Sequence, residues 1–202
     1  KKCHYFTDPF YISDKERKKP KNFGLYGESS HSNTHSVSNI FIEHIRDNWY
    51  WHNNKLPYHT NDIMNKSGFW IKFDYPTILN NITNTSQSGS ADRDPIRIRI
   101  EGSFTNNINF TYDTNGQNIT QDDGTWEIIC ENIELSGWRD INRYYEYNSG
   151  GGTNFANTKA YHYYKFIILE TRNDDHLEMS LTKFFGPNEK STVKLLDNNN
   201  VL

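Results

Sequence analysis

The sequence predicts an all-β domain, either a sandwich or a barrel, on three observations. Several segments alternate apolar and polar residues with the two-residue period of a strand. Almost no segment shows the periodicity of an amphipathic helix, and polar, asparagine-rich stretches separate the strand-like segments, as asparagine favours turns. The 202 residues suit one domain, and the 15% of aromatic residues supply a core with much buried area per side chain.

The first strands are expected after an exposed N-terminal segment. Residues 1–35 are interpreted as an N-terminal arm or linker, because "SDKERKKPKN" is charged and contains proline. From Val37, "VSNIFIEHI" predicts a strand or a short helix. In "GFWIKFDYPTILNNI", the alternation of Phe69, Ile71 and Phe73 with Trp70, Lys72 and Asp74 predicts a strand.

The clearest strand is "IRIRIEGSF", in which isoleucines and charged residues alternate. Arg97 and Arg99 are expected on its solvent face, paired with acids on a neighbouring strand. A long polar insertion, "TNNINFTYDTNGQNITQDDG", follows. Within 160–173 we expect one buried face and one half-exposed face. Further strands are predicted at 125–135, 160–173 and 176–186, before a polar tail at 187–202.

Five motifs, in this order, resemble the discoidin family, also called the F5/8 type C or galactose-binding-like domain. They are "FWIKFDYP", "IRIRIEGS", "TWEII", "YHYYKFIILETRN" and "LTKFFG", and the resemblance covers residues 36–186. It implies an antiparallel jelly-roll β-sandwich with long loops that is not catalytic. It further implies that loops at one end bind glycans, phospholipid headgroups or protein partners outside the cell. The family's Asp-Gly turn, which often helps to hold calcium, is not evident, so no cofactor is expected and calcium stays an open question.

Two aromatic segments are the candidate ligand contacts. The segment "RDNWYWHNNKLPYH" contains tryptophan, tyrosine and histidine among polar residues, and "GWRDINRYYEYN" combines aromatic rings with arginine. A sugar's apolar face stacks on an aromatic ring while polar neighbours bind its hydroxyls. The alternative is that these loops pack on themselves or on an oligomer neighbour. The predicted contacts are Trp49, Tyr50, His52, Tyr58, His59, Trp138, Arg139, Tyr144 and Tyr145.

Several classes of function and site are disfavoured. A net charge of -3 gives no reason to expect nucleic acid. No nucleophile elbow, carboxylate pair or phosphate-binding loop indicates an enzyme, and no CxxC or HExxH motif indicates zinc. No run of about 18 apolar residues predicts a membrane span. Cys3 and Cys130 leave both a disulfide and a buried thiol at Cys130 open.

The sequence therefore predicts a recognition module for carbohydrate or another cell-surface ligand. Its location would be extracellular, on a cell surface or on a virion surface, and a homo-oligomer is compatible with it. One alternative is a structural or oligomerisation module of a virion or surface assembly, which the aromatic segment "HYFTDPFYI" favours. Another is binding of phospholipid headgroups, with the membrane contacted only peripherally.

Overall fold

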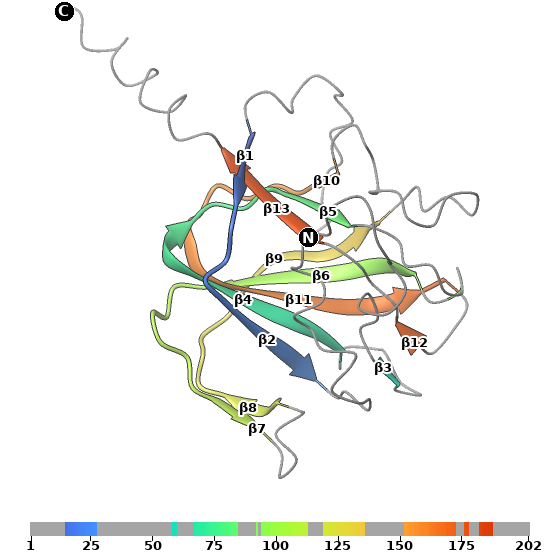
Figure 1. Cartoon of the computed structure of the whole chain (residues 1–202), viewed down its shortest axis with the longest axis horizontal. Helices are drawn as coiled ribbons and strands as arrows, with labels where there is room; N and C mark the ends of the chain where they lie inside the picture. The colour runs from blue at the N-terminus through green and yellow to red at the C-terminus, as the bar shows by residue number, and fades with distance from the viewer. Residues whose placement is uncertain are drawn as a thin grey trace, which may run out of the picture.

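The strands of this protein form two main antiparallel sheets, which are the layers of a β-sandwich (Figure 1). The computed structural model describes residues 15–27, 58–59, 67–84, 92, 94–112, 119–135, 152–172, 176–177 and 182–187. These residues contain strands and no α-helix. Accordingly, the part of the chain that the structure describes offers no helix of the length and apolar character needed to cross a bilayer.

The larger sheet has five strands and the smaller has four. The larger runs in the order β2 (Asn22–Gly27), β4 (Ser67–Thr77), β11 (Tyr161–Thr171), β6 (Pro95–Ser103) and β9 (Glu127–Glu134). The smaller runs β1 (Lys15–Lys18), β13 (Thr182–Pro187), β5 (Asn81–Asn84) and β10 (Thr153–Asn154). Two short pairs join β3 (Tyr58–His59) to β12 (His176–Leu177), and β7 (Phe110–Tyr112) to β8 (Ile119–Asp122).

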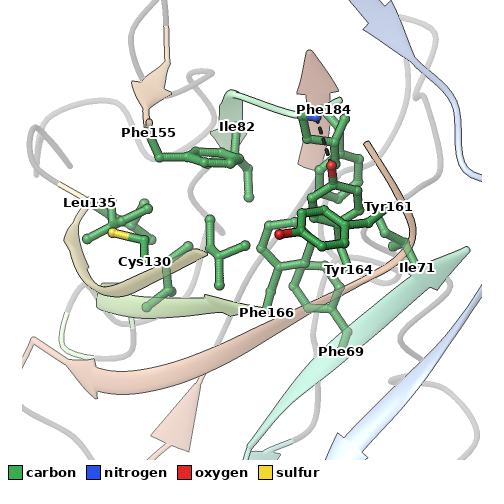
Figure 2. Close-up of a cluster of buried hydrophobic side chains, with 14 of the residues drawn as sticks. Phe69, Ile71, Ile82, Cys130, Leu135, Phe155, Tyr161, Tyr164, Phe166 and Phe184 are labelled. Carbon is green, nitrogen blue, oxygen red and sulfur yellow. Dashed lines mark hydrogen bonds between the residues drawn. The ribbon is translucent and has the colours of Figure 1, made fainter. Parts of the chain in front are cut away.

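The core between the two sheets is mainly aromatic and aliphatic (Figure 2). The ring of Phe166 on β11 stacks on Phe69 of β4 at a centroid distance of 5.0 Å. It also meets Phe184 of β13 at 5.2 Å, so these rings connect the larger sheet with the smaller. Phe69, Ile71 and Phe73 all lie in this cluster and on β4, which confirms the strand predicted from their alternation with polar neighbours.

Tyr164 fastens β11 to the corner that follows β4. Its buried hydroxyl donates to the carbonyl of Thr77 at 2.6 Å and accepts from the backbone N–H of Leu79 at 3.0 Å. The side-chain amide of Asn157 donates to the same hydroxyl at 3.2 Å. Burial raises the pKa of Tyr164. The hydroxyl is therefore a satisfied buried polar group that fixes the strand's position.

The outer face of the larger sheet is covered around Trp70 and Tyr163, which differs from the half-exposed face expected for 160–173. A shift in register between Tyr161 and Tyr163 places Tyr161 and Tyr164 in the main core, and Tyr163 in a second buried cluster. In this second cluster Phe110 of β7 stacks on Trp70 at 4.5 Å. The segment predicted to be a polar insertion thus folds back as the β7–β8 pair, below the larger sheet in Figure 1.

The N-terminal arm is also different from the expectation. Inside 1–35, β1 pairs with β13 and β2 pairs with β4, so both are edge strands of the sandwich. The single strand expected at 176–186 is instead two strands, β12 and β13, in different sheets. Cys130 is buried and disulfide-bonded. Of the two states considered for it, the disulfide therefore holds and the free thiol does not.

Candidate functional site

The structure places two of the predicted contact residues. Tyr58 and His59 form β3, which pairs antiparallel with β12 so that His59 lies opposite His176 and Tyr58 opposite Leu177. The last two residues of the first aromatic segment are therefore paired with the chain that follows β11. The other predicted contacts lie outside the described residues: Trp49, Tyr50, His52, Trp138, Arg139, Tyr144 and Tyr145.

Strand register shows that the two aromatic segments attach to the same end of the larger sheet. The first segment leads into β4, whose first residue, Ser67, is paired with Ile168 near the end of β11. The second segment follows β9, whose last residue, Glu134, is paired with Arg97 of β6, itself opposite Glu170 of β11. We call this edge, where β4 begins and β9 and β11 end, the loop end.

Ion pairs hold the strands together at the loop end. Arg97 Nε lies 3.1 Å from a carboxylate oxygen of Glu170 on the neighbouring strand, which confirms the pairing predicted for Arg97. Arg99 instead pairs with Glu101 on its own strand, at 3.0 Å. Arg172 donates its backbone N–H to the carbonyl of Asp94 at 3.0 Å, and its guanidinium lies 3.9 Å from the Asp94 carboxylate. The Arg97–Glu170 and Arg172–Asp94 pairs therefore connect β6 with β11 at the loop end.

In the ranges that the structure describes, no three His, Cys, Asp or Glu side chains come together as a metal site. Asp94, from the charged loop "ADRDP", is 1% exposed and lies beside Arg172. A carboxylate paired with a guanidinium is a poor calcium ligand, because the cation would have to displace that partner.

A second aromatic surface at the opposite end of the sheet was not predicted. Phe104 follows β6 with 52% of its surface exposed, and its ring lies 4.5 Å from that of Tyr161. The carboxylate of Glu127 accepts from Lys159 Nζ at 2.7 Å and from the Tyr161 hydroxyl at 3.0 Å. We call these four residues the Phe104 surface. The strand pattern of "IRIRIEGSF" could not show that Phe104 lies beyond the last paired residue.

Hydrogen bonding shifts the acidity of two groups on the Phe104 surface. The bonds from Lys159 and Tyr161 lower the pKa of Glu127. Burial, and then the bond to Glu127, raises the pKa of Tyr161 to about 12. At neutral pH the surface therefore presents an anionic carboxylate already engaged by two donors, with an exposed phenyl ring beside it.

Comparisons with known proteins give the fold. No protein-family model and no curated protein matches the sequence. The structure of the CBM32-1, CBM32-2 and M60 catalytic domains of Clostridium perfringens ZmpB is similar at a TM-score of 0.55 and 13% identity, over 96% of this chain and 17% of that one. The CBM32-1 and CBM32-2 domains of the same protein give 0.56 and 12%, over 97% of this chain and 45% of that one.

An F5/8 type C domain from Bacteroides fragilis is also similar, at a TM-score of 0.49 and 9% identity, over 87% of this chain and 99% of that one. The chain thus spans less than half the length of the two ZmpB structures. At such low identity the likeness establishes the fold and leaves the ligand open. The chain has the discoidin-like β-sandwich fold.

Proposed function

We propose that this domain is a non-catalytic carbohydrate-recognition module whose aromatic segments contact the sugar at the loop end. The observation that carries the proposal is the attachment of both segments to one end of the sheet. Two segments that are far apart in the sequence can then line one site. Their tryptophan, tyrosine, histidine and arginine side chains are the types that stack on sugar rings and bind hydroxyls.

Two further observations support a glycan outside the cell as the partner. The ZmpB structures that share this fold contain CBM32 domains, which are carbohydrate-binding modules. The disulfide at Cys130 favours an oxidising compartment such as the extracellular space. The module therefore suits an extracellular or surface-attached protein that meets glycans there.

The test is a glycan-array screen followed by titration of the best glycan. The double variant Trp49→Ala, Tyr144→Ala removes one ring from each aromatic segment. Phe104→Ala removes an exposed ring at the opposite end and is the matched control. We expect the double variant to lose at least about 30-fold in affinity, since a central aromatic contact contributes about 2 kcal/mol. Phe104→Ala should bind like the parent chain, and circular dichroism should show that both variants are folded.

Other outcomes point to other functions. Binding that survives the double variant but is lost in Phe104→Ala would move the site to the Phe104 surface. If no glycan binds and light scattering shows an oligomer at micromolar concentration, the domain is a structural module. Binding to phosphatidylserine vesicles without any glycan binding would favour recognition of a phospholipid headgroup.

A further inference from the structure

The sequence contains five Asn-x-Ser/Thr motifs, the pattern that accepts N-linked glycans in exported proteins. Their asparagines are Asn65, Asn81, Asn84, Asn109 and Asn118. The structure describes the side chains of two of these, Asn81 on β5 and Asn109 directly before β7. The two acceptors have opposite surroundings, so the fold separates motifs that look alike in the sequence.

Asn81 is enclosed where β5 pairs with β10. It is 2% exposed, and its Nδ2 donates to Oδ1 of Asn154, the residue paired with it on β10, at 2.9 Å. A Cβ on Gly152 would lie only 3.0 Å from Asn81 Oδ1, so the chain entering β10 also packs closely against this amide. A sugar on Nδ2 would need room that the packing does not leave, and it would separate β5 from β10. The folded domain therefore excludes a glycan at Asn81.

Asn109 lies on the outer surface of the β7–β8 pair (Figure 1). The middle residue of its motif, Phe110, stacks on Trp70 at 4.5 Å and so points toward the larger sheet. Successive side chains of a strand point to opposite faces, so Asn109 and Thr111 point away from the sheet, and both are exposed. The acceptor amide and the threonine of the motif are thus presented together to solvent.

The hydrogen bonds of Asn109 are compatible with a glycan. The carboxylate of Asp123, which is itself exposed, accepts from the backbone N–H of Asn109 at 2.8 Å and from its Nδ2 at 2.7 Å. A side-chain amide carries two hydrogens, and attachment of a sugar replaces one of them. The other hydrogen can still donate to Asp123, so the modified side chain keeps its partner and its orientation.

We propose that Asn109 carries an N-linked glycan when the chain is exported from a cell that makes such glycans, and that the folded chain is unmodified at Asn81. The donor is an oligosaccharide attached to a lipid diphosphate. The transfer joins Nδ2 to the anomeric carbon of the first sugar, breaks the bond from that carbon to the diphosphate, and releases one amide proton. The site goes beyond the proposed function, because it concerns a sugar that the domain carries and uses no aromatic-segment residue.

The experiment secretes the full chain, behind an added signal sequence, from a mammalian cell line and maps its glycopeptides by mass spectrometry. We expect a glycan at Asn109 in most secreted molecules and none at Asn81. Thr111→Ala destroys the motif but leaves Asn109 beside Asp123, so this variant should lose that one glycan. Thr111→Ser keeps the motif and is the matched control, which should retain the glycan. Circular dichroism and urea unfolding check that the secreted chains are folded.

The two parts of the proposal are read at separate sites. An unmodified Asn109 in the secreted, folded chain overturns the first part, as does a glycan that stays at Asn109 in Thr111→Ala. The second part is overturned by a secreted chain that carries a glycan at Asn81 and unfolds in urea like the unglycosylated chain made in bacteria. Neither readout depends on sugar binding at the loop end, so failure of the recognition proposal leaves this one intact.

Discussion

Replacing Lys165 by methionine should destabilise the fold far more than an ordinary loss of a lysine. Lys165 is a buried cation in the middle of β11, with its side chain 4% exposed. Its Nζ lies 3.2 Å from Asp122 and 3.7 Å from Glu101, and 3.9 Å from the ring centroid of Trp126. Methionine preserves the length of the side chain but removes the charge that these three groups share.

The expected cost follows from the burial of the two carboxylates. Asp122 and Glu101 have side chains only 12% and 11% exposed, and the variant removes the cation that these poorly solvated acids share, although Glu101 keeps its ion pair with Arg99. Breaking a buried ion pair by removing one partner costs about 3–5 kcal/mol. In a domain of this size roughly 1 kcal/mol lowers Tm by about 2–4 °C, so we expect a fall of about 6–20 °C.

The assay is urea unfolding followed by fluorescence and circular dichroism, with Lys159→Met as the control. Lys159 also faces a carboxylate, at 2.7 Å, but its side chain is 59% exposed, so its loss should cost less than about 1 kcal/mol. Asp122→Asn in the Lys165→Met background should recover part of the loss by removing one unpaired charge. Equal free energies of unfolding for Lys165→Met and Lys159→Met would refute the reasoning.

Two further predictions concern Tyr161 and Gly68. Tyr161 has a pKa raised to about 12, so its contribution to stability is complete below about pH 10 and is lost as the pH rises through about 12. Stability of Tyr161→Phe should therefore fall less steeply than that of the parent chain over this interval in alkaline urea unfolding, and parallel curves would contradict this. A Cβ on Gly68 would lie 2.0 Å from the carbonyl oxygen of Phe166 on the paired strand, so Gly68→Ala should cost at least about 2 kcal/mol. If the urea midpoint of Gly68→Ala equals that of the parent chain, β4 and β11 can move apart to admit the methyl group without loss of stability, and this prediction is wrong.

Strands in which apolar and polar residues alternate strongly could be predicted from the sequence. An edge strand and the short β7–β8 pair could not. The period of Phe69, Ile71 and Phe73 identifies a strand because one face is buried in a core. β1 was predicted as part of an arm because its sequence "KERK" is entirely charged and has no apolar period that would indicate a strand. The β7–β8 pair was also missed, because Phe110 is surrounded by polar residues in the sequence. Its apolar contact is with Trp70, which is distant in the sequence.

For the candidate sites, too, the sequence shows the residue types, whereas their positions relative to one another depend on the fold. Aromatic residue types near polar neighbours can be read from the sequence, so the two aromatic segments were recognisable as contact candidates. Their attachment to one end of the sheet depends on β4, β11, β6 and β9 being paired in that order and in a particular register. The pairing of β1 with β13, which lie near opposite ends of the sequence, is likewise decided only by the tertiary structure.

The sequence by itself determined the class of this protein, an all-β domain, and the richness of its strands in aromatic residues. These properties follow from local alternation and composition, which do not depend on how the chain folds in space. Only the tertiary structure decided which faces are buried and which side chains meet. Lys165 shows the reason. Its place in the strand alternation predicts a half-exposed side chain, but Asp122 of the β7–β8 pair, 43 residues earlier in the sequence, lies against it and helps to bury it.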